Sequence, residues 1–325
     1  MGSAFWGTRQ TAIGRMRRRA RLRSVRTMNS SLLEVHNVTR SYGSRAVLKD
    51  VSFGVRGGRI TGFVGSNGAG KTTTMRVILG VLAPDSGSVT LDGSPLGEGQ
   101  RTRFGYMPEE RGLYPKMKLA EQLVYLGRLH GMSADQAKAS TDALLERLSL
   151  TERADTLVEA LSLGNQQRAQ IAASLVHDPE VLVLDEPFSG LDPIAVESVL
   201  AVLKERADSG VPVLFSSHQL DIVERLCDDL VVIADGEIRA SGSREGLRAE
   251  HTLPRYELQL GGDTGWLRDE PGVSVLDFAG GYALFDVDSD ATAQRVLQRA
   301  VATSTVERFA PQLPSLSQIF KEVIQ

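Results

Sequence analysis

Apolar residues occur along this chain in two patterns, as short continuous runs and as sets at helical spacing. The continuous runs predict short strands at residues 60–64, 181–184, 213–215 and 230–233. The run at 181–184 is entirely apolar, which is typical of a strand buried on both faces of a parallel sheet. Helically spaced sets predict a helix that ends before Pro84 and another over 193–208. Strands that alternate with helices in this way predict an α/β fold.

A largely helical segment interrupts this alternation, and we expect a helical subdomain at about 117–175. Leu119, Leu123 and Leu126 line one predicted helix face. Ser133 and Gln136 have the spacing of a capping box, which marks the start of the next helix. The preceding segment, 101–116, is predicted to be a loop.

Strand-like alternation is found on both sides of the α/β part. It predicts strands within 33–53 and a strand at 88–91 that ends at the turn Asp92-Gly93. Further along, the pattern predicts strands at 256–260, 273–276, 284–287 and 306–309, with helices at 290–302 and 315–324. We therefore expect a main domain over 31–250 and a small antiparallel α+β domain over 251–325. The small domain has no catalytic constellation.

A glycine-rich segment between a predicted strand and a predicted helix fits the spacing G-x-x-x-x-G-K-T. Its residues are Gly65, Ser66, Asn67, Gly68, Ala69, Gly70, Lys71, Thr72 and Thr73. Glycines allow the tight turn that directs backbone N–H groups toward phosphate oxygens, and the following helix adds the positive end of its dipole. Lys71 would reach the β- and γ-phosphates, and the Thr72 hydroxyl would bind Mg²⁺. The sequence therefore predicts a nucleotide-binding P-loop.

The strand at 181–184 ends in Asp185-Glu186. An acidic residue at the end of such a strand is placed to hold Mg²⁺ beside the phosphate loop, because ligands of open α/β sheets collect at this edge. Asp185 is the candidate metal ligand. Glu186 would face the γ-phosphate and polarise a water.

Charge and cysteine content restrict the remaining possibilities. Removing the eight Arg residues of the first 27 positions from a net charge of −3 leaves about −11, so the body is acidic, which argues against a nucleic-acid-binding surface there. The single cysteine, Cys227, permits no internal disulfide and fits a reducing cytoplasm; its apolar neighbours predict a buried helix position. No run approaches 18 apolar residues, so the sequence predicts no membrane span.

Residues 1–30 differ from the rest because the segment is rich in Arg and has no acidic residue. We expect a disordered leader. The alternative is a basic arm that contacts anionic lipid or nucleic acid.

The motif set resembles the ATP-binding subunits of ABC transporters over about 32–245. Besides the phosphate loop and Asp185-Glu186, the signature motif L-S-G-G-Q-x-Q-R is matched in part by Leu161-Ser162-Leu163-Gly164-Asn165-Gln166-Gln167-Arg168. The resemblance continues through Ser189-Gly190-Leu191-Asp192 and through a strand that leads to Ser216-Ser217-His218. It implies a P-loop NTPase of the ABC ATPase type.

The resemblance also implies roles for the matched residues. Glu186 would be the general base, His218 a γ-phosphate contact, Lys71 a catalytic phosphate contact, and Tyr42 the residue that stacks on adenine. The signature residues Ser162, Gly164 and Asn165 would contact ATP held by a second subunit, and Asp192 would link the two subunits. A homodimer that closes on ATP and Mg²⁺ is therefore expected.

Two departures from the family pattern point to a subgroup. Glu109 stands where the family usually has Gln, and Leu163 stands where the signature usually has Gly. A carboxylate at 109 can bind Mg²⁺ but cannot donate a hydrogen bond. Together with Pro314-Ser315-Leu316-Ser317-Gln318-Ile319-Phe320, these features resemble bacterial ABC-2-type exporter ATPases of the sodium-extrusion and antibiotic-resistance type, which carry a C-terminal accessory domain.

The resemblance implies an ATPase at the cytoplasmic face of the cell membrane that powers export through a separately encoded permease. The permease is expected to dock between Arg101 and Met132. One alternative is an ABC ATPase that acts on nucleic acid or ribosomes, which only the basic leader favours. Another is a simple P-loop kinase or GTPase, which the signature helix and the strand leading to His218 disfavour.

Overall fold

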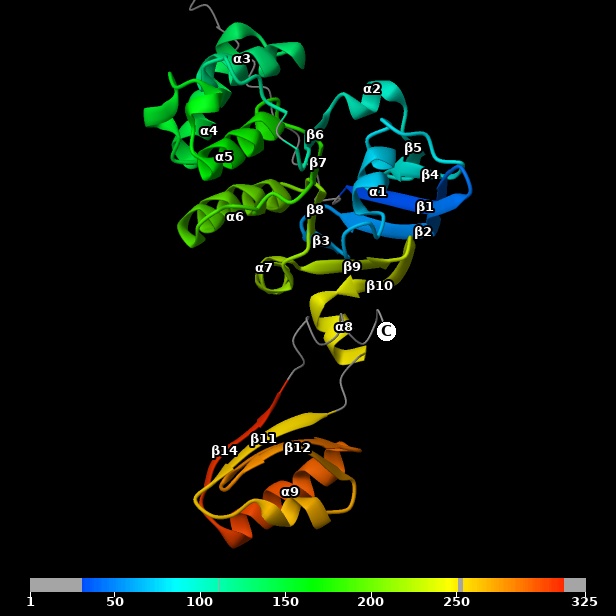
Figure 1. The fold of residues 1–325 in the computed structure, drawn as a ribbon, viewed down its shortest axis with the longest axis vertical. Coiled ribbons are helices and arrows are strands. Elements are labelled where there is room, and N and C mark those ends of the chain that lie inside the picture. Colours follow the sequence, from blue (N-terminus) through cyan, green and yellow to red (C-terminus); the bar gives the residue numbers. More distant parts are fainter. Residues whose placement is uncertain (1–30, 111, 251–253, 313–325) are drawn as a thin grey trace, which may run out of the picture.

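A computed structural model of the chain describes residues 31–110, 112–250 and 254–312. These residues form an α/β body with two sheets and a smaller unit with a third sheet (Figure 1). The predictions for the leader at 1–30 and the helix at 315–324 lie outside the described residues.

The larger sheet of the body has the strand order β10-β9-β3-β8-β7-β6. Its strands are β3 (Ile60–Val64), β6 (Phe104–Met107), β7 (Val181–Leu184), β8 (Val213–Ser217), β9 (Asp229–Ala234) and β10 (Glu237–Ser243). All pairs are parallel except β9 with β10, which follow each other through a short turn. Every residue of β3, β7, β8 and β9 is buried, as the continuous apolar runs predict. The parallel order brings the carboxyl ends of β3, β7 and β8 to one edge.

The prediction of a loop over 101–116 was wrong at Phe104–Met107, where the chain forms β6 alongside β7. Helix α2 (Glu98–Arg101) precedes this strand. The four-residue strand is too short to show a period, and Gly105 in its interior weakens the strand pattern. That glycine is required because a Cβ there would lie 2.3 Å from the carbonyl oxygen of Ser174 on a neighbouring helix.

The second sheet of the body has the order β2-β1-β4-β5 and is antiparallel. Its strands are β1 (Leu32–Tyr42), β2 (Arg45–Arg56), β4 (Ser86–Leu91) and β5 (Ser94–Pro95). Helix α1 (Lys71–Ile78) lies between the two sheets, because its buried Met75 and Ile78 share one apolar cluster with Leu33 of β1 and Phe63 of β3. This packing holds the start of α1 at the carboxyl edge of β3.

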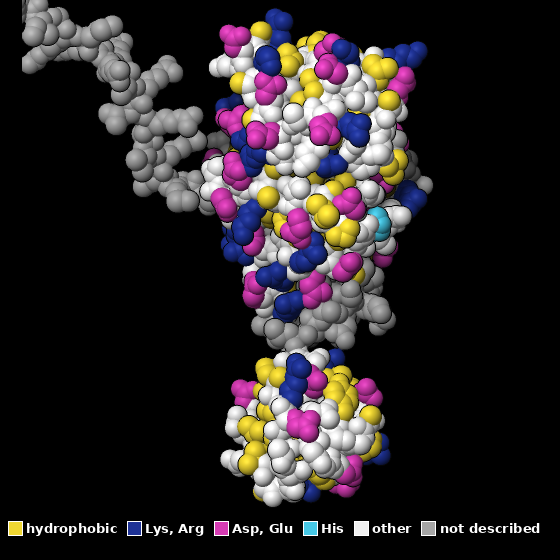
Figure 2. All heavy atoms as spheres, turned by 90° about the vertical axis from the view of Figure 1, so that its left-hand side faces the viewer, with side chains coloured by type: hydrophobic (Ala, Val, Ile, Leu, Met, Phe, Trp, Pro, Cys, Tyr) yellow, Lys and Arg dark blue, Asp and Glu magenta, His cyan; other side chains and the backbone are white. Residues whose placement is uncertain are grey.

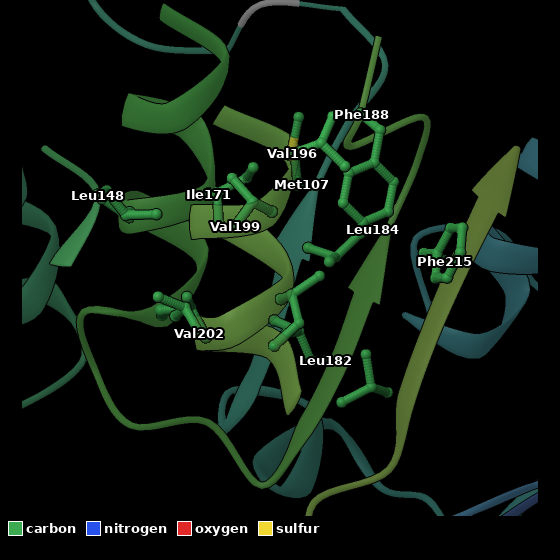
Figure 3. Close-up of a cluster of buried hydrophobic side chains, with 14 of the residues drawn as sticks. Met107, Leu148, Ile171, Leu182, Leu184, Phe188, Val196, Val199, Val202 and Phe215 are labelled. Carbon is green, nitrogen blue, oxygen red and sulfur yellow. The ribbon is translucent and has the colours of Figure 1, made fainter. Parts of the chain in front are cut away.

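A helical layer covers the other face of the six-stranded sheet. It contains α3 (Leu119–Leu129), α4 (Ala134–Arg147), α5 (Leu163–Leu175), α6 (Pro193–Asp208) and α7 (Leu220–Leu226), with 3-10 turns η1 (Thr151–Arg153) and η2 (Val158–Ala160). Figure 3 shows Ile171 of α5 and Val199 of α6 packed over Leu184 of β7. The predicted capping box is present, because the Gln136 N–H donates to Ser133 Oγ at 3.2 Å and the Ser133 N–H donates to the Gln136 side chain at 3.0 Å.

Cys227 directly follows α7 and is 1% exposed, so its predicted burial is confirmed, although the helix ends one residue earlier. Its sulfur is so close to β3 that a Cβ on Gly62 would lie 2.6 Å away. Burial raises the pKa of this thiol, so the thiol is a packing group.

The smaller unit follows α8 (Arg244–Glu250) and has the strand order β12-β13-β11-β14, with antiparallel pairs throughout (Figure 1). Its elements are β11 (Arg255–Leu260), η3 (Gly265–Asp269), β12 (Val273–Ala279), β13 (Tyr282–Val287), α9 (Asp290–Thr303) and β14 (Val306–Pro311). Val296 and Ala300 of α9 pack on Leu258 and Phe285 of the sheet. The described part of this unit therefore has its own apolar core.

Candidate nucleotide-binding and catalytic site

The phosphate loop joins β3 to α1 at the carboxyl edge of the large sheet. Gly68 and Gly70 have φ of 81° and 113°, which L side chains rarely adopt. At Gly70 a Cβ would also lie 2.7 Å from the Leu48 side chain, and at Gly65 it would lie 2.4 Å from the carbonyl oxygen of Ile233. The loop therefore requires Gly68 for its φ, Gly65 for close packing, and Gly70 for both.

Lys71 begins α1 and lies against the phosphate loop. Its Nζ donates to the carbonyl oxygens of Gly65 at 2.7 Å and Ser66 at 3.2 Å, and the residue is 8% exposed. Burial lowers the pKa of the Lys71 ammonium, while the carboxylates of Glu186, Asp185 and Glu109 act in the opposite direction. The cation is thus held at the loop by hydrogen bonds and by three nearby acids.

Thr72 and Asp185 come together as the sequence predicts. The Thr72 hydroxyl donates to Asp185 Oδ2 at 2.9 Å, and Asp185 is 1% exposed at the end of β7. Ser216, which had no predicted role, donates from Oγ to Asp185 Oδ1 at 2.5 Å and accepts the Glu186 N–H at 2.9 Å. The only available signal for Ser216 was a hydroxyl at the end of an otherwise apolar run.

Glu186 and His218 form the second pair at this edge. His218 Nδ1 lies 2.9 Å from Glu186 Oε1, a distance at which the ring N–H donates to the carboxylate. Burial raises the pKa of Glu186, whereas the hydrogen bond and charge of His218, and then the charge of Lys71, lower it. A carboxylate with a raised pKa and a histidine partner is suited to accept a proton from water.

Lys71, Thr72, Asp185 and Glu186 line one cavity of about 360 Å³, and His218 is not among its lining residues. Its lining residues are Tyr42, Arg45, Val47, Asn67, Gly68, Gly70, Lys71, Thr72, Thr73, Glu109, Asp185 and Glu186. Tyr42 and Glu109 thus reach the phosphate loop from distant parts of the sequence. Sequence reasoning missed Arg45 and Val47, whose one signal was their closeness to Tyr42.

The predicted signature and linking residues do not line this cavity. Ser162 precedes α5 and accepts the Asn165 N–H on its Oγ at 3.4 Å, while the Asn165 side chain accepts from Arg168. Asp192 caps α6 by accepting the Ala195 N–H at 2.8 Å. The roles of these residues, and of Gly164 beside them, toward a second subunit remain predictions.

Comparisons with known proteins extend over nearly the whole chain. Residues 48–189 match the ABC transporter family, and residues 242–324 match the family described as ATP-binding protein DrrA1-3-like, C-terminal domain. The uncharacterized ABC transporter ATP-binding protein YhaQ of Bacillus subtilis is 34% identical over 90% of this chain and 98% of its own length.

Two further relatives carry functional names. The linearmycin resistance ATP-binding protein LnrL of Bacillus subtilis is 35% identical over 72% of this chain and 73% of its own length. The Nod factor export ATP-binding protein I of Paraburkholderia xenovorans is 37% identical over 84% of this chain and 92% of its own length.

Solved structures agree with these assignments. A structure described as the ATP-binding subunit of an ABC transporter superposes with a TM-score of 0.63 at 33% identity, covering 67% of this chain and 92% of its own. The dimeric cassette MJ0796 shares the fold with a TM-score of 0.60 at 23% identity, covering 65% of this chain and 98% of its own. The predicted fold class is confirmed.

Within the described ranges, none of the helices combines the length and apolar character needed to cross a bilayer. ATP-binding subunits of ABC transporters bind and hydrolyse ATP, form dimers and act with transmembrane permeases. The predicted resemblance is confirmed, and the chain belongs to the ATP-binding subunits of ABC transporters, with a DrrA-like C-terminal domain.

Proposed function

We propose that this ATPase powers export through a separately encoded ABC-2-type permease. The observation that carries the proposal is the cavity at the phosphate loop, where Lys71, Asp185 and Glu186 lie together. The match of residues 242–324 to the DrrA-like family adds support. The names of LnrL and of the Nod factor export protein, which concern resistance and export, support the direction of transport.

The residues at the cavity fit ATP with Mg²⁺. Tyr42 would stack on adenine, the loop N–H groups would hold the phosphates, and Lys71 would exchange its carbonyl partners for phosphate oxygens. The Thr72 hydroxyl and the Asp185 carboxylate are adjacent oxygen donors of the kind that Mg²⁺ prefers, and Glu109 adds a third carboxylate to the cavity. Bound Mg²⁺ would neutralise phosphate charge.

The proton chemistry belongs to Glu186. Its carboxylate would take a proton from the attacking water. His218 would orient that carboxylate through their hydrogen bond and would also contact the γ-phosphate. Ser216 would hold the two acids in fixed positions relative to each other, because its hydroxyl hydrogen-bonds to the side chain of Asp185 and the backbone of Glu186.

A second copy of the chain would complete the site. Ser162, Gly164 and Asn165 lie outside the cavity of their own chain, which is the arrangement expected if they contact ATP in a partner. Asp192 would join the two copies. In this proposal ATP closes the dimer and hydrolysis reopens it.

The permease would dock on the helical layer beside β6. Three aromatic or aliphatic side chains between Arg101 and Met132 are exposed, namely Tyr114 (57%) before α3, and Tyr125 (43%) and Leu129 (64%) on α3. Tyr125 and Leu129 are four residues apart on α3 and therefore share one helix face. Exposed apolar groups on one face favour a protein partner. Docking on a permease would place the subunit at the cytoplasmic face of the membrane.

A role on nucleic acid or ribosomes has less support. Figure 2 shows Lys and Arg side chains interspersed with Asp and Glu on the described helical face, with no continuous basic patch in that view. Nucleic-acid surfaces concentrate positive charge. The alternative would therefore depend on the leader.

We also propose the domain division 31–250 and 251–325. Support comes from the separate apolar clusters, since the cluster of the small unit contains only residues from β11 onward. The region matched by the DrrA-like family begins nearby, at residue 242.

The test is purification of the full chain from native membranes through a C-terminal tag. We expect a polytopic permease to accompany it and to raise its ATP hydrolysis. Recovery of ribosomes or nucleic acid without a membrane protein would overturn the export proposal. A tagged variant with Tyr114, Tyr125 and Leu129 changed to Ser should keep basal hydrolysis and lose the permease.

A further inference from the structure

One contact at the site joins the signature helix to the catalytic strand within the same chain. The side chain of Gln167, on the second turn of α5, donates from Nε2 to the backbone carbonyl oxygen of Glu186 at 2.9 Å. The two residues are 19 positions apart. No role assigned so far uses this side chain.

The Glu186 backbone requires such support. Its φ is 53°, in the left-handed region that residues other than glycine rarely adopt. Neighbouring groups hold both ends of the residue. Ser216 Oγ accepts its N–H, while Gln167 and the Ser189 N–H, at 3.2 Å, share its carbonyl oxygen. The direction of the carboxylate depends on this backbone, because rotation of the peptide would carry the side chain away from His218.

The start of α5 touches the same loop a second time. The Leu163 side chain packs against Gly190, where a Cβ would lie 3.3 Å from its Cδ2. Gly164 lies beside Gly190 and Leu191. The first two turns of α5 therefore contact the segment 186–191 at both ends, and movement of the helix must move that segment.

We propose that Gln167 is a positioning residue that links hydrolysis at the chain's own phosphate loop to the position of α5. This inference rests on the proposed function, in which Ser162 at the start of α5 contacts the ATP of the second subunit. ATP bound there would set α5, and Gln167 would set the Glu186 backbone in turn. Each Glu186 is then aligned only when the second subunit holds the ATP that Ser162 of the same chain contacts.

The test uses Gln167→Met in the full-length chain, which keeps the length of the side chain and removes the donor. We expect kcat for ATP to fall by about fivefold to tenfold, the change that corresponds to one lost hydrogen bond, with KM within about twofold. The Hill coefficient for ATP should also fall. Gln167→Glu, which cannot donate when ionised, gives a second variant of the same length if the Met variant does not fold.

Gln166→Met is the matched control. Gln166 lies on the same helix and is buried, but its Nε2 donates to the carbonyl oxygens of Val158 and Leu161, away from the cavity. We expect this variant to lower Tm and to leave kcat within about twofold. Gln167→Met should instead lower kcat and leave Tm close to the wild-type value, because its effect is on the alignment of Glu186.

A double-mutant cycle with Ser162→Ala tests the link itself. If Gln167 acts through α5, the double variant loses less kcat than the product of the single losses. Multiplicative losses, or a Gln167→Met variant with wild-type kcat, would overturn the inference. Failure of the proposed function is distinguishable: if Ser162 did not contact the ATP of the second subunit, Ser162→Ala alone would leave kcat at the wild-type value, whereas failure of the Gln167 link would leave the Ser162→Ala loss in place.

Discussion

The carboxyl edge of the large sheet and the small C-terminal unit use charged residues in different ways. At the sheet edge, Lys71, Asp185 and Glu186 are each less than 10% exposed; Lys71 bonds the phosphate-loop carbonyls, and Ser216 bonds both Asp185 and Glu186. In the C-terminal unit the ion pairs Arg255–Asp286 and Arg308–Glu257 lie on the side of the sheet opposite α9.

This difference indicates that the charged residues at the sheet edge serve catalysis, whereas those of the C-terminal unit serve folding. Burying charged groups is costly unless they are paired, so a cluster of them at the end of three strands indicates a function that requires it. The described C-terminal residues instead build an apolar core under a polar face, which is what folding alone requires. Variants in the two regions should therefore affect different properties.

Glu186→Gln should have the largest effect. Loss of the general base is expected to reduce kcat by about 100-fold to 10,000-fold while ATP binding persists and the dimer accumulates. Steady-state hydrolysis and size-exclusion chromatography with ATP measure both effects. Glu257→Gln, in the C-terminal unit, is the control and should hydrolyse ATP at the wild-type rate; rapid hydrolysis by Glu186→Gln would remove the base assignment.

Val296→Ala should show the reverse pattern. Val296 is fully buried between α9 and its sheet, so removal of two methyl groups should lower the free energy of unfolding of that unit by about 2 kcal/mol. Denaturant unfolding measures the loss, and hydrolysis should be unchanged. If Val296→Ala lowered the stability of the α/β body and its ATP hydrolysis as well, the two regions would fold as one cooperative unit.

The pH profile provides a smaller and more specific test of the edge. Because burial raises the pKa of Glu186, kcat/KM should fall with decreasing pH at a higher pH than for an ordinary carboxylate near 4.3. His218 lowers that pKa, so His218→Ala should move the acid limb further upward. If the acid side of the pH profile did not move in His218→Ala, His218 would have no effect on the pKa of Glu186.

His177 should cause a loss of stability in acid. It stacks on His130 with ring centroids 3.7 Å apart, and burial together with His130 lowers its pKa to about 4. The unfolded chain therefore takes up a proton near pH 6.5 that the folded chain does not, and Tm should fall as pH drops from about 6.5 to 4. His177→Gln should flatten this slope; an unchanged slope would assign it to other groups.

Much of the site could be predicted because its motifs are local. The phosphate loop, the pair Asp185-Glu186 and the residues around Ser162 are each contiguous in the sequence, and each adjoins a strand or helix that the sequence predicts. Over such short segments the backbone conformation depends on residue type, as the positive φ of Gly68 and Gly70 shows.

Other features required the fold. The strand at Phe104–Met107 was missed because Gly105 interrupts its apolar run, whereas the equally short run at 181–184 is entirely apolar, and because the strand depends on its neighbours β7 and α5. The contact of Gln167 with Glu186 spans 19 positions, and that of Ser216 with Asp185 spans 31. Such hydrogen bonds form only after β7, β8 and α5 have packed side by side. Spacing along the chain carries no information about which distant donor will meet which acceptor, because strand order and helix packing set that distance.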